Sequence, residues 1–96
     1  MLLEIITPEK KLFAGIADAI QLPGKDGLFQ VLNGHAPIIS ALKKGTVKID
    51  LADDHKSFEG NKGTIAHDPS KDKVLNVEIN GGVVELLNDK MIVLAE

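Results

Sequence analysis

The sequence predicts an all-β protein, an antiparallel β sandwich or barrel of about eight to ten short strands in a single domain spanning residues 1–96. Three observations predict this class. Apolar and polar residues alternate with a period of two in 46–51 and in 75–79, as in strands with one buried face. Clusters of turn-forming residues divide the chain at short intervals. No run with helical periodicity follows a good N-cap.

The first third of the chain predicts two strands. Leu2–Thr7 is apolar with one charge, and Pro8 starts the turn that ends it. Leu12–Leu22 is a long strand, because Gly15 and the missing N-cap disfavour a helix, although the alanine content would also suit one. Its even positions are expected to line one face, namely Leu12, Ala14, Ile16, Ile20 and Leu22.

Two turns follow within a short stretch and leave no room for a helix. Pro23–Gly27 combines a proline, two glycines and two charges, which is typical of an exposed turn between strands. Asn33–Pro37 is a second sharp turn, since Asn-Gly tolerates left-handed geometry and Pro37 cannot donate to a ladder. The chain is expected to restart as a strand at Ile38.

The second half predicts strands around a polar segment. In 46–51 the buried face carries Val47, Ile49 and Leu51. Residues 52–73 are rich in Asp, Lys, Gly and Ser and predict a loop or an exposed hairpin. The remaining elements are a strand at 75–80, a turn at Gly81-Gly82, a strand at 83–87, a turn at Asn88-Asp89 and a strand at 91–95.

Composition excludes several classes of protein. A net charge of −3 and a pI near 5.5 disfavour nucleic-acid binding, which requires a basic surface. The chain has no Cys, Trp or Tyr, so it lacks disulfides, a thiolate site and the aromatic rows of many sugar-binding sandwiches. No basic segment precedes the first apolar run, and no run approaches the ~20 residues of a membrane span. We therefore expect a soluble protein without a secretion signal.

Few residues could carry chemistry. His35 lies in a Gly-Pro turn without a nucleophile that the sequence pairs with it, so a structural role is the better interpretation. His55 with Asp53 and Asp54, and His67 with Asp68, could bind a metal adventitiously, but solvated loop charge is the simpler explanation. None of the paired glycines opens a helix that could hold a phosphate. We expect no catalytic residue, no cofactor and no metal site.

A succession of motifs resembles a known family. They are Leu3–Lys10, Leu12–Gly15, Leu22-Pro23-Gly24 with Gly27, Val31-Leu32, Gly34-His35-Ala36-Pro37, Ser40–Lys43, Gly81–Glu85 and Val93–Glu96. In this order they resemble the N-terminal β domain of the epsilon subunit of the bacterial F-type ATP synthase. The likeness covers both ends of the chain and fails only between about Ala52 and Lys73. The family also implies a flattened β sandwich.

The resemblance implies a non-catalytic rotor-stalk subunit that links the gamma subunit to the membrane c-ring and couples proton flow to ATP synthesis. It implies a peripheral location on the cytoplasmic face of the inner membrane, with membrane contact only through the c-ring. The expected partner-facing residues are Lys25, Asp26, Leu28, Gly34 and His35. Leu28 stands where many relatives have a carboxylate, so polar contact with the ring would run through Lys25 and Asp26. The two C-terminal helices of many relatives, which can brake ATP hydrolysis, do not follow Glu96.

Two other functions remain open from the residues alone. An unrelated β-sandwich binding module for carbohydrate or adhesion is disfavoured by the missing Trp, Tyr and Cys. A small metalloenzyme using His55 and His67 is disfavoured because no third ligand and paired base accompany them.

Overall fold

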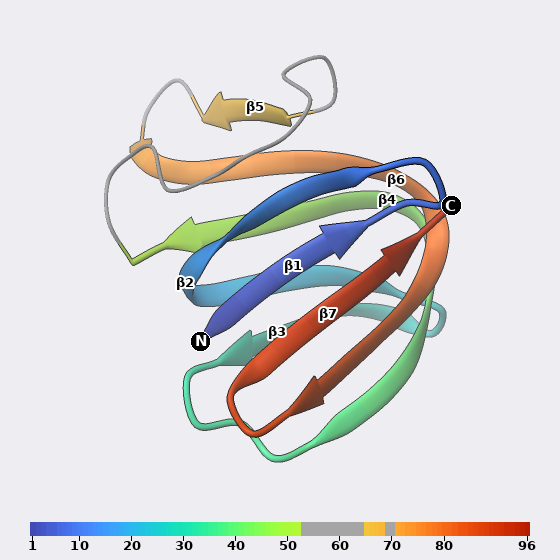
Figure 1. The fold of residues 1–96 in the computed structure, drawn as a ribbon, viewed down its shortest axis with the longest axis horizontal. Helices are drawn as coiled ribbons and strands as arrows, with labels where there is room; N and C mark the ends of the chain where they lie inside the picture. The colour runs from blue at the N-terminus through green and yellow to red at the C-terminus, as the bar shows by residue number, and fades with distance from the viewer. Residues whose placement is uncertain (53–64, 69–70) are drawn as a thin grey trace.

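The computed structural model describes residues 1–52, 65–68 and 71–96, and each regular element in this part of the chain is a β-strand (Figure 1). The strands are β1 (Leu2–Ile6), β2 (Lys11–Gly24), β3 (Gly27–Leu32), β4 (Ile38–Leu51), β5 (Ile65–Asp68), β6 (Lys71–Leu87) and β7 (Lys90–Ala95). The all-β prediction is confirmed. The strands are fewer than expected because β2, β4 and β6 are long, with 14, 14 and 17 residues.

The strands form one sheet that closes on itself. Its order is β1-β7-β6-β4-β2, and β1 pairs with β2 to complete the ring. β3 adds to β2 and β5 adds to β6 outside this ring. The pairs are antiparallel except for β1 with β7, which run parallel. Closure lets the inward side chains form one core.

The barrel is flattened into two layers because β4 and β6 pass through both. Ile38–Lys43 of β4 pairs with the second half of β6, and Gly45–Asp50 pairs with its first half. We define the β1–β7 layer as β1, β7, the start of β2, the first half of β4 and the second half of β6. The β3 layer contains β3, the end of β2, the second half of β4 and the first half of β6.

Gly81-Gly82 does not form the predicted turn, because β6 runs straight through it. Gly82 has φ 147°, and a Cβ at this position would lie 2.1 Å from the carbonyl oxygen of Leu94 on β7. The glycine pair therefore lets two backbones approach closely where β6 changes partner from β5 to β7. The prediction failed because a Gly-Gly pair is compatible with either a turn or a close backbone contact.

The predicted single apolar face of β2 is also wrong. Ile16 is 46% exposed, whereas Phe13 and Ala17 are fully buried. The β2–β4 register shifts between Ala17 and Ala19, so the buried positions change from odd to even at Asp18, and Ile20 and Leu22 then point inward. A local irregularity of this kind overrides strict alternation.

The predicted turn at Pro23–Gly27 is shorter in the structure. Only Lys25 and Asp26 form the turn, while Pro23 and Gly24 are buried at the end of β2. A Cβ on Gly24 would lie 2.8 Å from the ring of Phe29, which explains the glycine there. Packing against β3 therefore buries Pro23 and Gly24, which local turn chemistry alone would leave exposed.

The other turn predictions are confirmed in the described residues. At Asn33–Pro37 the N–H of His35 donates to the carbonyl of Leu32 at 3.2 Å, and Gly34 has φ 80°. Asn88 and Asp89 have φ 53° and 62°, as a two-residue hairpin requires. In the segment 52–73, whose loop or hairpin conformation stays a prediction, the described strand β5 pairs antiparallel with β6. Residues 53–64 and 69–70, with His55, Asp53 and Asp54, lie outside the described residues.

The core fills the space between the two layers. Its members are apolar and come from the described strands of both layers, and the predicted inward set Val47, Ile49 and Leu51 is among them. The largest fully buried side chains are Phe13, Leu3, Ile5, Ile20, Leu22, Ile49, Leu75, Leu86, Met91, Val31, Val47 and Val77. No polar side chain among the described residues is buried. The core therefore contributes stability through apolar burial alone.

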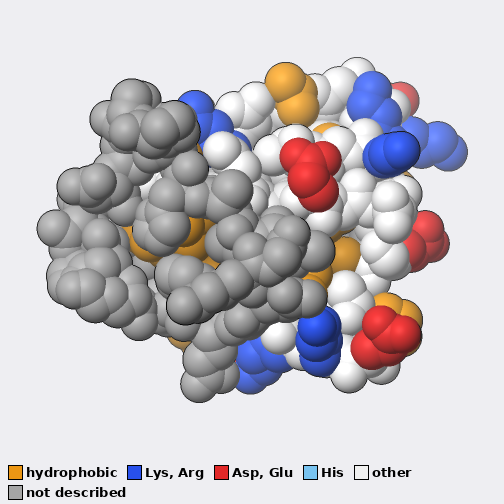
Figure 2. Space-filling view, turned by 90° about the horizontal axis from the view of Figure 1, so that it is seen from above, with side chains coloured by type: hydrophobic (Ala, Val, Ile, Leu, Met, Phe, Trp, Pro, Cys, Tyr) orange, Lys and Arg blue, Asp and Glu red, His pale blue; other side chains and the backbone are white. Residues whose placement is uncertain are grey.

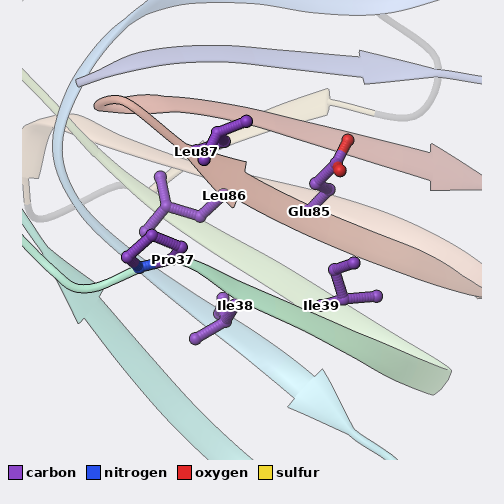
Figure 3. A pocket seen from close by; sticks show the side chains of 6 residues that line it. All are labelled: Pro37, Ile38, Ile39, Glu85, Leu86 and Leu87. Atoms are coloured by element: carbon purple, nitrogen blue, oxygen red, sulfur yellow. The ribbon is translucent and has the colours of Figure 1, made fainter.

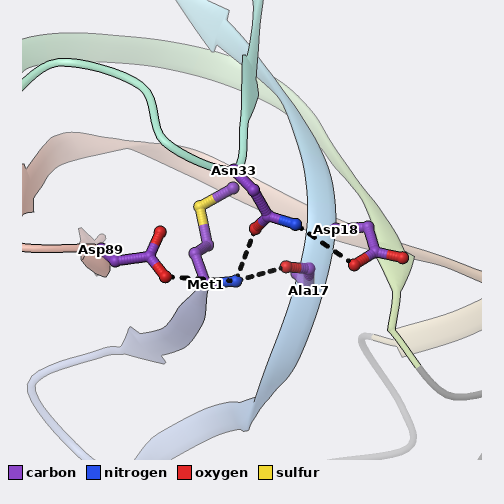
Figure 4. Close-up of polar contacts among 5 residues, drawn as sticks. All are labelled: Met1, Ala17, Asp18, Asn33 and Asp89. Atoms are coloured by element: carbon purple, nitrogen blue, oxygen red, sulfur yellow. Dashed lines mark hydrogen bonds and ion pairs between the residues drawn. The ribbon is translucent and has the colours of Figure 1, made fainter.

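Polar contacts around Met1 join one end of the barrel (Figure 4). Its amino group donates to the carbonyl oxygen of Ala17 at 2.7 Å and to Oδ1 of Asn33 at 2.7 Å. The same group lies 3.9 Å from Oδ2 of Asp89, and Nδ2 of Asn33 donates to Oδ1 of Asp18 at 3.3 Å. The contacts connect β2, the β3–β4 loop and the β6–β7 turn.

Candidate functional site

The outer surface of the β1–β7 layer is apolar although its side chains reach solvent. We call it the apolar face. Its members are Leu2, Ile6, Ile16, Ile39, Ala41, Val83, Leu87, Ile92 and Leu94. Ile39 is 74% exposed and Leu94 is 55% exposed. Single exposed apolar side chains are ordinary, but a contiguous set of this kind marks a surface that another molecule covers.

Cross-strand pairing makes this set contiguous, because residues that pair across strands share a face. The register arranges the outward side chains in three rows. These are Ile16, Leu2, Lys90 and Leu87; then Ala14, Glu4, Ile92, Glu85 and Ile39; then Lys11, Ile6, Leu94, Val83 and Ala41. Two mainly apolar rows therefore flank a central row that contains two carboxylates.

The two carboxylates of the central row differ in their surroundings. Glu4 forms an ion pair with Lys11, whose Nζ lies 3.3 Å from Oε2 of Glu4. No ion pair of Glu85 is found among the described residues. The free carboxylate thus lies within an apolar surface, where covering it would require a cationic partner.

Two shallow depressions border Glu85. The first has a volume of about 340 Å³ and is lined by Pro37, Ile38, Ile39, Glu85, Leu86 and Leu87. Figure 3 shows how side chains of β4 and β6 surround it. The second, of about 330 Å³, lies between β6 and β7 and also includes Glu85 and Leu87. The first depression has mainly apolar walls and can receive apolar side chains from a protein partner. Asn88 and Lys90 also line the second.

The outer surface of the β3 layer is different, because polar side chains dominate it. They are Gln21, Gln30, Thr46, Lys48, Asp50, Asn76 and Glu78. Leu28 and Leu32 of β3 are also exposed on this side. The Thr46 hydroxyl donates to Oε2 of Glu78 across the β4–β6 ladder. Figure 2 views the molecule from above Figure 1, and among the residues that are not grey it shows lysine and acidic side chains together with small apolar areas. The asymmetry between the layers singles out the apolar face as the candidate binding surface.

The sequence-predicted partner-facing residues do not form one site. Lys25 and Asp26 are the turn between β2 and β3, and Leu28, the second residue of β3, is 66% exposed. Gly34 and His35 lie in the loop after β3. Because β3 has 6 residues, the two groups are about 20 Å apart at opposite ends of the strand.

The two groups also have different neighbours. The Lys25 N–H donates to the carbonyl of Ala41 at 3.0 Å, which holds the hairpin against β4. Nδ1 of the exposed His35 donates to the carbonyl of Ala36 at 2.7 Å. Pro37, two residues further on, lines the first depression. The His35 loop thus borders the apolar face, while the Lys25 hairpin marks a separate end of the molecule.

These residues are suited to binding a partner through surface contacts. In the described part of the chain, no three His, Cys, Asp or Glu side chains are grouped as metal ligands require. Helices long and apolar enough to cross a membrane are likewise absent from the described residues. The described surface therefore presents an apolar face, the carboxylate of Glu85 within it, and two exposed turns.

Sequence reasoning missed the apolar face. The available signal was apolar residues on both faces of the late strands, as in Val83-Val84, Leu86-Leu87 and Ile92-Val93-Leu94. A strand with only one buried face should alternate with polar residues. The additional apolar positions indicate a second covered surface.

The proteins that resemble this chain belong to one group. A family model described as the β-sandwich domain of the ATP synthase delta/epsilon chain matches residues 1–76. The ATP synthase epsilon chain of Chlorobium limicola is 37% identical over 94 residues, which are 98% of this chain and 86% of that protein. That of Chlorobaculum tepidum is 38% identical with the same coverage. That of Desulfatibacillum aliphaticivorans is 38% identical over the whole chain, which spans 55% of its length.

A solved structure shares the fold. It is a chain in the cryo-EM structure of the central stalk and c-ring of the Tetrahymena thermophila mitochondrial ATP synthase, with a TM-score of 0.64 and 19% identity. The match covers 98% of this chain and 63% of that one. At this identity the likeness supports the closed β sandwich.

Proposed function

Because the chain belongs to the ATP synthase delta/epsilon-chain family, we propose that it acts as the epsilon subunit of the rotor stalk, a non-catalytic part that joins the gamma subunit to the membrane c-ring. In this role it transmits rotation and so couples proton flow to ATP synthesis. Family membership removes the alternative of an unrelated β-sandwich binding module. A rotor part needs stiffness, which the closed sheet provides.

The apolar face is the proposed contact with the gamma subunit. The observation that carries this assignment is the contrast between the apolar outer surface of the β1–β7 layer and the polar outer surface of the β3 layer. Burying Ile39, Val83 and Leu94 under a partner would remove exposed apolar area from water. The His35 loop borders this face through Pro37, so Gly34 and His35 are assigned to its rim.

The Lys25 hairpin is the proposed contact with the c-ring. Lys25, Asp26 and Leu28 lie at the opposite end of β3 from His35, and this separation lets one rigid domain reach two partners. Exposed charges at such a rim set orientation and association rate more than affinity. The subunit would then sit on the cytoplasmic face of the inner membrane as a peripheral protein, in contact with the membrane only through the ring.

Titration with purified cognate gamma subunit tests the proposal. Leu94→Glu places a charge at the centre of an apolar row, and we expect the dissociation constant to rise about thirtyfold or more. Gln21→Glu makes a charge change on the outer surface of the β3 layer and serves as the matched control. Equal binding by the parent chain and Leu94→Glu, or no binding by the parent, would overturn the assignment. Circular dichroism verifies that both variants remain folded.

A further inference from the structure

The two layers have open edges where a strand pairs on one side only. In the described parts of the chain, such edges include the first half of β2, the first half of β4, β3 and β5. Unpaired N–H and C=O groups along an edge can bind an extended segment of another protein. Of these edges, the first halves of β2 and β4 belong to the β1–β7 layer, so they border the apolar face.

The two edges of this layer are not equally suited to strand addition. The β2 edge carries the charged Lys11, and the Ile16 carbonyl near its other end already accepts from the N–H of Ala52 at 3.0 Å. Charged side chains on an edge disfavour pairing with another strand. Residues 38–41 of β4 are uncharged, and Figure 1 shows this half of β4, in green, along the lower right margin of the molecule. The β4 edge is therefore the better site for a partner strand.

Backbone hydrogen bonds show which groups of β4 point to this edge. The Ala41 carbonyl accepts from the N–H of Lys25 at 3.0 Å, so the backbone groups of Ala41 face away from β6. Residues two apart in a strand direct their N–H and C=O groups to the same side, so those of Ile39 also face away from β6. Among the described residues neither group of Ile39 has a hydrogen-bond partner. Ile39 thus offers one donor and one acceptor to a neighbouring strand.

Ile39 also belongs to the apolar face. Its side chain is 74% exposed and lies beside Glu85 at the end of the central row. The depression of about 340 Å³ lies at the same place, with Pro37 and Ile38 among its lining residues. A protein that covers the apolar face therefore reaches the backbone groups of Ile39 as well. This continuity selects the gamma subunit as the source of the added strand.

We propose that the gamma subunit adds an extended segment along residues 38–41 of β4. In this pairing a backbone carbonyl of gamma accepts from the Ile39 N–H, and a backbone N–H of gamma donates to the Ile39 carbonyl. Both parallel and antiparallel addition use these two groups. The inference rests on the proposed function and specifies how gamma is held. The gamma residue beside Ile39 extends the central row, so we expect it to be apolar.

Amide hydrogen exchange of the whole chain, followed by NMR with and without purified cognate gamma subunit, tests the pairing. In the free chain the Ile39 N–H should exchange quickly, because it lacks an acceptor. Gamma should slow its exchange at least about tenfold. Fast exchange at Ile39 in a gamma-bound chain would overturn the inference and leave the proposed stalk function standing.

The N–H of Gln30 is the matched control, because it points to the open edge of β3 in the other layer. Leu28 faces Pro23, which has no N–H, so Leu28 and Gln30 occupy non-hydrogen-bonded positions of the β2–β3 ladder. Exchange at Gln30 should be the same with and without gamma. Equal slowing at Ile39 and Gln30 would overturn the inference, because gamma would then not select the β4 edge.

Replacing the donor distinguishes a hydrogen bond from simple coverage by gamma. Ile39→Pro removes the outward N–H and leaves the β4–β6 ladder intact, and proline is tolerated on an edge strand. We expect it to weaken gamma binding at least about tenfold more than Ile39→Ala, which removes the side chain but keeps the N–H. Gln30→Pro makes the same backbone change on β3 and should leave gamma affinity unchanged.

The outcomes separate the inference from the proposed function. Equal losses of gamma affinity in Ile39→Pro and Ile39→Ala would overturn the strand addition alone. Absence of gamma binding to the parent chain would overturn the proposed function and the inference with it. Circular dichroism checks that the variants fold, and if Ile39→Pro did not, exchange at Ile39 in the parent chain decides.

Discussion

Individual residues fix this barrel where backbones or loops come close together. Gly82 allows β6 to pass β7, since any side chain would meet the Leu94 carbonyl. Gly34 also has a positive φ, of 80°, but a Cβ there would have nothing within 4 Å. Substituting each glycine by alanine therefore distinguishes the cost of a strained backbone from the cost of a steric clash.

We predict that Gly82→Ala destabilises the fold by about 3 kcal/mol or more, because strain and a clash with backbone add together. Gly34→Ala should cost about 1–2 kcal/mol from the left-handed conformation alone. Urea denaturation of the two variants measures both values. Equal losses in the two variants would show that the approach to Leu94 is not limiting.

A second prediction concerns the contacts around Met1. Asn33→Ala removes an acceptor of the Met1 amino group and the amide donor to Asp18, so the free energy of unfolding should fall by about 1–2 kcal/mol. Asn80→Ala, at an exposed position of β6, should change it by less than about 0.5 kcal/mol. Denaturant titration at neutral pH compares them. A loss in Asn33→Ala no larger than in Asn80→Ala would contradict a stabilising role.

At the scale of elements, β6 and β7 contribute both to the core and to the proposed gamma-binding surface. Val84, Leu86 and Met91 point inward, while Val83, Leu87 and Leu94 are exposed, so these strands are apolar on both faces. Such strands are typical of sheets that are covered on both sides. Glu85 of β6 and Lys90 of β7 are the charged exceptions on the outer side, and Glu85 lies in the central row.

We predict that Glu85 pairs with a lysine or arginine of the gamma subunit, because an unpaired carboxylate would be costly inside that interface. Glu85→Gln should weaken gamma binding about tenfold and reduce its salt dependence. Glu4→Gln changes a carboxylate in the same row that Lys11 already neutralises, and should have little effect. Titrations at two salt concentrations measure both. Equal effects of the two substitutions would remove Glu85 from this role.

At the scale of the whole molecule, the two proposed binding ends belong to one stiff body. The Lys25 hairpin and the His35 loop are about 20 Å apart along β3, and β3 is bonded to β2 of the closed ring. A rigid domain can therefore hold gamma on one surface and the ring at another. The described core is continuous between the layers, so neither surface moves independently.

Because the two ends are separate, a substitution at one end should lower the affinity for one partner only. Lys25→Glu should weaken binding to purified c-rings about fivefold and leave gamma binding unchanged, because the reversed charge lies in the hairpin alone. His35→Ala should weaken gamma binding and leave ring binding unchanged. Parallel titrations with the two partners distinguish the ends. If either substitution lowered both affinities by the same factor, one shared site would replace the two proposed here.

The sequence alone determined the fold class, most strand positions and the family resemblance, because alternation, turn residues and ordered motifs are local properties. The inward set Val47, Ile49 and Leu51 and the turn at Asn88-Asp89 followed directly from such patterns. Only the tertiary structure decided the course of β6 through Gly81-Gly82 and the change of face at Asp18. Both depend on which strand lies beside the residue, and a local pattern carries no information about neighbours distant in the chain.

For the candidate site, too, some features follow from the sequence and others only from the tertiary structure. The hairpin at Lys25 and the loop at His35 could be read from turn chemistry, yet only the fold placed them at opposite ends of β3. The apolar face combines β1, β2, β4, β6 and β7, which are joined through the cross-strand register. Each strand by itself shows only additional apolar residues. Their contiguity arises when the sheet closes, because closure brings the first and last strands of the described chain side by side.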